Sequence, residues 1–121
     1  MLISKAGYKA TFLINSLGGG GAEGVCLNLA NELADKGWDI TIVTMNLRKR
    51  DYLERLNDKV RLIDLGISNA RYAFLPMAKY FSKISSQTIL VFNYELAVLL
   101  VFIRKILRLN FRIVARNINT L

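Results

Sequence analysis

The sequence contains no histidine and only one cysteine, Cys26, in 121 residues. A lone cysteine cannot form an internal disulfide, which favours a cytoplasmic protein over a secreted one. Because no histidine is present to activate the thiol, we do not expect Cys26 to act as a nucleophile. Its expected role is packing in the protein interior.

Long apolar runs are also missing. The longest uninterrupted one is Leu96 to Ile103, far short of the roughly 20 residues that cross a bilayer. The first ten residues, MLISKAGYKA, lack the sustained apolar core of a signal peptide. We therefore expect neither a membrane span nor an export signal.

Acidic residues are scarce in the second half of the chain. Residues 66–121 hold eight lysines and arginines but only one acid, Glu95, and the net charge of the whole chain is +8. The positive electrostatic field of such a chain favours the binding of phosphorylated ligands, lipid head groups or nucleic acid. A hydrophobic content of 53% with 21% charged residues indicates one folded domain over residues 1–121.

Short apolar runs alternate with helical patterns along the chain. We predict strands over residues 9–15, 39–45, 60–65, 88–92 and 111–115, and helices over residues 22–36, 69–85 and 94–109, with a short helix near residues 51–56. Gly37 is a natural end for the first helix, and Pro76 is tolerable only in the first turn of the second. The fold class predicted is α/β: an open, mostly parallel, Rossmann-like sheet with helices on both faces.

Ligands of such sheets bind beyond the carboxyl ends of the strands. This rule selects three segments, residues 16–21, 93–95 and 116–120. The first holds part of LGGGGAEG, residues 17–24, which contains five of the chain's eight glycines. Bare backbone at the start of a helix lets a phosphate or a sugar approach closely. A permissive turn with no ligand is the alternative interpretation.

Gly19, Gly21 and Gly24 also satisfy the G-x-G-x-x-G pattern of dinucleotide-binding domains. A ribose-binding carboxylate should then end the second strand, but Asp39 stands at its other end, which disfavours NAD. Residues 48–50, Arg-Lys-Arg, could hold the extra phosphate of NADP, although a solvated basic loop explains them too. An NADP-binding Rossmann domain therefore remains an alternative.

One segment, FLINSLGGGGAEGVCLNLANELADKGWDITIVTM, resembles the amino terminus of family 4 glycosyltransferases of the GT-B fold. Members often begin with a strand, a GGAE-type loop, a helix ending in glycine and a second strand. Later pieces, VRLIDL, TILVFNYELA and RIVARNINTL, follow in the matching order. The resemblance covers nearly the whole chain.

The resemblance implies a retaining glycosyltransferase that moves a sugar from a nucleotide-sugar donor to a glycan or lipid-linked acceptor, as in cell-envelope polysaccharide biosynthesis. This chain would be the acceptor-side domain, and Gly18, Gly19, Gly20 and Gly21 would border the donor's diphosphate and sugar. The acceptor-side residues expected from their place at strand ends are Asn93, Tyr94, Glu95, Arg116, Asn117 and Asn119. Glu23 suits the first helical turn as a capping carboxylate.

Two departures from the family pattern affect what the chain can do. Relatives often carry a histidine after the fourth strand or near the fifth, and this chain has none. We expect the carboxy-terminal domain that grips the nucleotide in such relatives to be absent here, and therefore a fragment without turnover of its own. We assign no catalytic residue, and we expect no cofactor, no metal ion and no nucleic-acid partner.

The apolar helix predicted from Tyr94 carries Arg104, Lys105 and Arg108 toward its end. Its simplest interpretation is a sheet-covering helix whose cations suit the C-terminal dipole. An alternative is attachment to an anionic membrane surface, where a lipid-linked acceptor would lie. The location expected is cytoplasmic, with peripheral binding to the inner face of the membrane as this alternative.

Overall fold

The computed structural model describes residues 8–15, 21–47, 55–67, 72–84 and 87–115. Within these ranges the elements are β1 (Lys9–Ile14), α2 (Gly21–Asp35), β2 (Asp39–Thr44), β3 (Arg61–Asp64), α3 (Phe74–Phe81), β4 (Thr88–Val91), α4 (Tyr94–Leu107) and β5 (Arg112–Ala115). Most of the short helix predicted near residues 51–56 lies outside the described residues.

The strands form one five-stranded sheet in the order β3-β2-β1-β4-β5. Every neighbouring pair is parallel. The α/β class and the open, Rossmann-like parallel sheet predicted from the sequence are therefore confirmed. The chain first winds from β1 out to β3 and then returns to place β4 on the other side of β1, so the winding reverses between β1 and β4.

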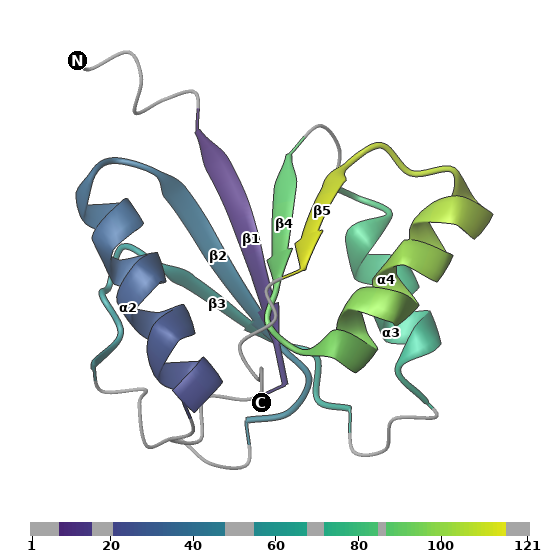
Figure 1. The fold of residues 1–121 in the computed structure, drawn as a ribbon, viewed down its shortest axis with the longest axis horizontal. Helices are drawn as coiled ribbons and strands as arrows, with labels where there is room; N and C mark the ends of the chain where they lie inside the picture. The colour runs from purple at the N-terminus through teal and green to yellow at the C-terminus, as the bar shows by residue number, and fades with distance from the viewer. Residues whose placement is uncertain (1–7, 16–20, 48–54, 68–71, 85–86, 116–121) are drawn as a thin grey trace.

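Helices cover both faces of this sheet (Figure 1). Successive side chains of a strand point to opposite faces, and the neighbours Phe12 and Leu13 of β1 belong to different core clusters. The Phe12 cluster includes Cys26 and Ala30 of α2, whereas the Leu13 cluster includes residues of α3 and α4. Helix α2 thus packs on one face, and α3 and α4 pack on the other.

The central strands are the most buried. Five of the six residues are buried in β1 and in β2, as their apolar sequences, KATFLI and DITIVT, predict. The outer strands β3 and β5 contain no fully buried residue. No helix in the described part of the chain is long and apolar enough to cross a membrane.

Gly37 ends α2 as predicted. Its φ is +96°, in the left-handed region, and its N–H donates to the carbonyl oxygen of Ala34 at 3.0 Å. The N–H of Trp38 donates to the carbonyl oxygen of Leu33, also at 3.0 Å. These two bonds form a Schellman motif, which satisfies carbonyls that the helix leaves unpaired.

We expect Gly37→Ala to lower the free energy of unfolding by about 1–2 kcal/mol, because a Cβ disfavours the left-handed conformation. Urea denaturation followed by circular dichroism measures this loss. Gly37→Asn is the matched control and should lose less, since asparagine tolerates this conformation better. Equal stabilities of Gly37→Ala and the parent protein would contradict this account.

Helix α3 is shorter than the predicted range of residues 69–85. Tyr72 and Ala73 precede it, and Ser82 follows as its C-cap. Pro76 explains the late start, because a proline has no N–H and is compatible with a helix only in the first turn. It is the third residue of α3, as the first-turn requirement predicts.

Helix α4 begins at Tyr94, as predicted, and ends two residues before the predicted Leu109. Arg108, its C-cap, has a φ of 56° in the left-handed region. The N–H of Leu109 then donates to the carbonyl oxygen of Arg104 at 2.9 Å, which closes the helix. The chain can turn directly into β5 from this point.

Candidate functional site

The reversal of winding between β1 and β4 defines the candidate site. In open parallel sheets, ligands bind in the crevice outside the carboxyl ends of the strands at this switch point. The carboxyl ends of β1 and β4 are Ile14 and Val91. Helices α2 and α4 both begin at this edge of the sheet, which is the lower edge in Figure 1.

Two asparagines join the strand ends across the switch point. The backbone N–H of Asn15 donates to Oδ1 of Asn93 at 2.9 Å, although the residues are 78 positions apart. The carbonyl oxygen of Asn15 accepts the backbone N–H groups of Met45 and Asn46, each at 3.1 Å. The ends of β1, β2 and β4 are thereby fixed relative to one another.

Asn93 occupies the N-cap of α4, but its side chain makes no cap hydrogen bond. Its Oδ1 is directed to β1 instead. The first amides of a helix have no partner within the helix, and here the earliest intrahelical acceptor is the carbonyl oxygen of Asn93, which receives Ala97 N–H at 3.0 Å. The amides of Tyr94 and Glu95 therefore lie at the partially positive end of α4.

Gly21 is the first residue of α2 and is exposed. Beyond its own helix backbone, the described residues place no atom within 4 Å of a Cβ added to Gly21. The described part of the protein therefore leaves open space at this backbone position. Glu23 stands in the first turn of α2, where the sequence predicts a capping carboxylate.

Four of the residues predicted from the sequence are described, and all four lie at the carboxyl edge: Gly21, Asn93, Tyr94 and Glu95. Tyr94 is 78% exposed, and Glu95 is also exposed. The remaining predicted residues lie outside the described residues: Gly18, Gly19, Gly20, Arg116, Asn117 and Asn119. The basic segment at residues 48–50 lies outside them as well.

Asn15 is a site residue that the sequence reasoning missed. It appeared there only as the last residue of the first predicted strand. Polar residues at the carboxyl ends of two strands, Asn15 and Asn93, were the available signal. Their hydrogen bond depends on β1 and β4 being neighbours, which the local patterns do not reveal.

The carboxyl end of β2 carries no carboxylate, in agreement with the sequence analysis. Asp39 lies at the amino end of that strand, where its Oδ1 is 3.2 Å from Nη2 of Arg61. Asp64 of β3 lies beside the end of β2, and its Oδ1 accepts the hydroxyl of Thr44 at 3.1 Å and the N–H of Gly66 at 3.3 Å. Asp64 therefore orders the loop that leaves β3.

Cys26 is fully buried within α2, as predicted. Burial raises the pKa of its thiol far above the ordinary value, and the carboxylate of Glu23 raises this pKa further. The thiol therefore stays protonated and has little nucleophilic character. Its place in the core agrees with a packing role.

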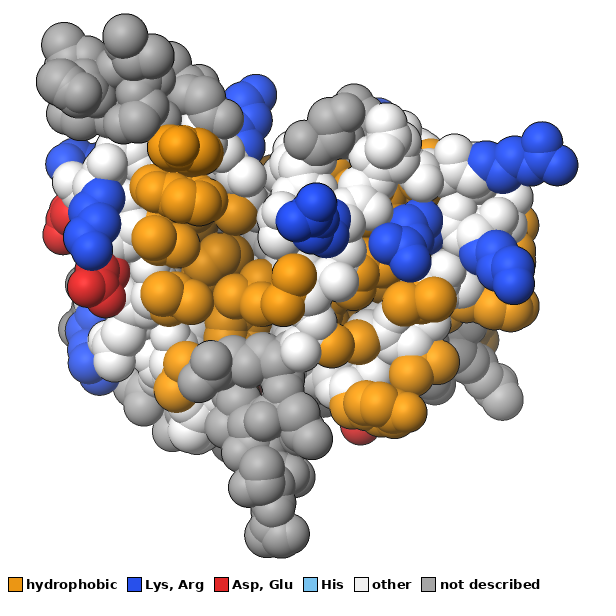
Figure 2. Space-filling model, turned by 45° about the horizontal axis from the view of Figure 1, so that its top comes forward, with side chains coloured by type: hydrophobic (Ala, Val, Ile, Leu, Met, Phe, Trp, Pro, Cys, Tyr) orange, Lys and Arg blue, Asp and Glu red, His pale blue; other side chains and the backbone are white. Residues whose placement is uncertain are grey.

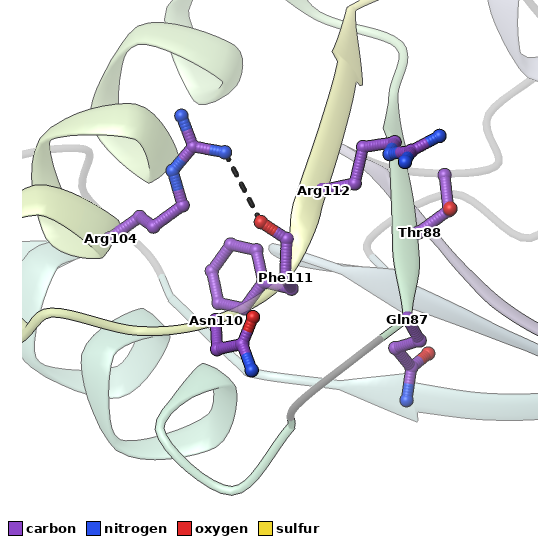
Figure 3. Close-up of a pocket in the computed structure, with 6 residues that line it drawn as sticks. All are labelled: Gln87, Thr88, Arg104, Asn110, Phe111 and Arg112. Carbon is purple, nitrogen blue, oxygen red and sulfur yellow. Dashed lines mark hydrogen bonds between the residues drawn. The ribbon is translucent and has the colours of Figure 1, made fainter.

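A polar cavity of about 610 Å³ lies at the opposite, amino edge of the sheet (Figure 3). It is lined by Gln87, Thr88, Arg104, Asn110, Phe111 and Arg112. An apolar cavity of about 370 Å³, the β5 groove, runs between α4 and β5. Its lining residues are Tyr94, Ala97, Val98, Val101, Arg104, Ile113 and Ala115.

The described ranges contain no cluster of three or more metal-binding side chains of the His, Cys, Asp and Glu types. What they define is an open, Rossmann-like α/β sheet whose switch point is bordered by two helix starts. Comparisons of the chain with protein-family models, with curated proteins and with solved structures found no significant match.

Proposed function

We propose that this chain forms the acceptor-side domain of a retaining glycosyltransferase that uses a nucleotide-sugar donor. The observation that carries the proposal is the exposed Gly21 backbone at the start of α2, beside the reversal between β1 and β4. The GGAE sequence around it supports the same assignment. Bare amides and a helix dipole suit the negative charge of a diphosphate.

In this proposal the donor's diphosphate lies against the start of α2 at Gly21, and the glycine-rich sequence that precedes Gly21 supports this assignment. The amides of Tyr94 and Glu95 contribute a second positive helix end, and Asn93 holds that end next to β1. The exposed side chains of Tyr94 and Glu95 then face the acceptor. Stabilising the departing diphosphate is the main electrostatic task in such a transfer.

The proposal assigns this chain half of an active site. Transfer requires the donor and the acceptor to be held at reacting distance, and the nucleotide would be held by a second, carboxy-terminal domain. We therefore expect this chain to bind but not to turn over its substrates. The catalytic residues are left unassigned.

The outer surface of α4 suggests where the acceptor is presented. Phe102 is 57% exposed and Ile106 is 52% exposed, and Lys105 and Arg108 lie beside them. Apolar side chains flanked by cations suit an anionic membrane surface. A lipid-linked acceptor on the cytoplasmic face of a membrane fits this arrangement.

The proposal is tested by titrating the ¹⁵N-labelled chain with UDP-glucose, GDP-mannose and NADP while following backbone amide shifts. We expect a nucleotide sugar to shift the amides of Gly21, Tyr94 and Glu95 in a saturable manner. NADP is the rival ligand, because β2 ends without the carboxylate that NAD requires.

Saturable shifts with NADP alone would assign the domain to dinucleotide binding and overturn the proposal. Shifts that avoid Gly21 for every ligand would show that the start of α2 is not part of the site. A short single-stranded oligonucleotide serves as the control for binding by charge alone, which should weaken steeply as salt is added.

A further inference from the structure

Strand β5 forms one open edge of the described sheet. It pairs only with β4 among the strands that the structure describes. The N–H of Arg112 donates to the carbonyl oxygen of Gln87 at 2.9 Å, toward β4. Because backbone groups alternate in direction along a strand, the N–H and C=O groups of Ile113 and Ala115 point away from β4. Such a row of backbone groups is a template for another strand.

The β5 groove lies directly beside this open edge. Its wall on α4 includes Tyr94, Val98 and Val101, which are 78%, 52% and 42% exposed. Its wall on the sheet is formed by Ile113 and Ala115. Side chains of an added strand that point toward α4 would enter this groove and cover apolar surface.

Positive charge borders the same edge. Arg104 and Arg112 line the cavity where β5 begins, and Figure 3 shows their side chains on the two sides of the strand. One N–H of Arg104 donates to the carbonyl oxygen of Phe111 at 3.1 Å, and a guanidinium group carries five N–H groups. Between residues 87 and 115 the only acid is Glu95. Figure 2 shows several Lys and Arg side chains over this part of the molecule.

We propose that the open edge of β5 and the β5 groove bind an extended segment of a partner protein that has alternating apolar and acidic side chains. The segment pairs with the outward backbone groups of Ile113 and Ala115. Its apolar side chains enter the groove, and its acidic side chains, which point to the opposite face of the sheet, reach Arg112. The two-residue alternation of a strand matches this division of the surface. Tyr94 borders both the β5 groove and the switch point, but this inference does not depend on the glycosyltransferase proposal, because it is argued from β5 and its groove.

Other occupants fit these observations less well. Lipid tails cannot pair with the outward amides and carbonyls of β5. A second copy of the chain would bring the same net charge of +8 to this basic edge, which opposes association. An acidic strand satisfies both the hydrogen bonds and the charge.

The test uses a fluorescein-labelled ten-residue peptide of alternating valine and glutamate, capped at both ends, and the full chain. We expect saturable binding by fluorescence anisotropy that weakens as salt is added. In the bound state, the amides of Ile113 and Ala115 should exchange with deuterium at least tenfold more slowly. A peptide of alternating valine and lysine should bind at least tenfold more weakly.

Ala115→Pro removes an outward N–H without removing a bond to β4, and proline is tolerated at such edge positions. We expect this variant to bind the acidic peptide at least tenfold more weakly, whereas its matched control, Ala115→Ser, should bind normally. Arg112→Glu should reverse the preference between the two peptides. Lys79→Glu makes the same charge change on α3 and should not reverse it. Circular dichroism of each variant verifies its fold.

Three results would overturn the proposal. The first is no peptide binding, or binding that Ala115→Pro leaves unchanged. The second is sedimentation with phosphatidylserine-containing vesicles that Phe102→Ser abolishes, without any peptide binding. The third is a dimer in analytical ultracentrifugation that Ala115→Pro dissociates, which would make a second copy the occupant.

Discussion

Replacing Phe81 with alanine is expected to lower the free energy of unfolding by about 3–5 kcal/mol, a typical cost for truncating a buried phenylalanine. Phe81 is fully buried, and its ring centroid lies 5.1 Å from that of Tyr80 and 6.1 Å from that of Phe111. It is the last residue of α3, which has only eight residues. So short a helix is marginal alone, and its packing on the core is what keeps it folded.

This loss would be a large part of the total stability, since single domains are typically stable by about 5–15 kcal/mol. Urea denaturation followed by far-ultraviolet circular dichroism measures it directly. Leu75→Ala is the matched control on the same helix, because Leu75 is 75% exposed, and its effect should stay within about 0.5 kcal/mol. Similar losses for both variants would show that α3 is not anchored through Phe81.

The second large effect expected is on ligand affinity rather than on stability. Gly21→Ala should weaken nucleotide-sugar binding at least tenfold, because the added methyl group occupies space that the proposed diphosphate needs. Within the described protein this methyl group meets nothing within 4 Å. The stability of the variant should be unchanged or raised by up to about 1 kcal/mol, since alanine favours a helix.

The opposite signs of these two effects make the substitution informative. The affinity comes from the amide-shift titration described above, and the stability from urea denaturation of the same sample. Asn28→Ala changes an exposed residue of α2 and serves as the control for binding. Unchanged affinity in Gly21→Ala would mean that no ligand approaches this backbone. A loss of stability together with affinity would attribute the effect to folding.

Much of the fold could be predicted from local sequence. The buried strands Lys9–Ile14 and Asp39–Thr44 are apolar or β-branched runs, and such runs alternating with helical patterns require a parallel sheet. Gly37 acts through the backbone alone, so its position predicted one helix end. Pro76 indicated a first turn near that residue, but the predicted start of that helix at residue 69 was wrong, since α3 begins at Phe74. These effects are local, so a single sequence was sufficient to predict them.

The neighbours of each strand could not be predicted in this way. Periodicity shows which side of a strand is buried but not which strands lie beside it, so the order β3-β2-β1-β4-β5 came only from the structure. The bond between Asn15 and Asn93 depends on that order. The β5 groove depends on the strand order as well. The edge of β5 stays open beside α4 only because β5 is the last strand of the described sheet.

The candidate site was predicted only in part. The rule of carboxyl strand ends selected Gly21, Asn93, Tyr94 and Glu95, and the structure places all four at that edge. Their assignment to a donor or an acceptor stays a prediction, since it came from a sequence resemblance. Local reasoning also could not show that the Asn93 side chain would accept the amide of Asn15 instead of capping α4.

The central position of β1 has a consequence for biosynthesis. One side of β1 can pair with β2 once about 45 residues have been made, but its other side needs β4, which ends at Val91. Until then an apolar strand emerging from the ribosome has an open flank, and such flanks invite aggregation. Pairs so distant along the chain also form slowly. A nascent chain of this protein should therefore depend on protection by chaperones until its fourth strand has been translated.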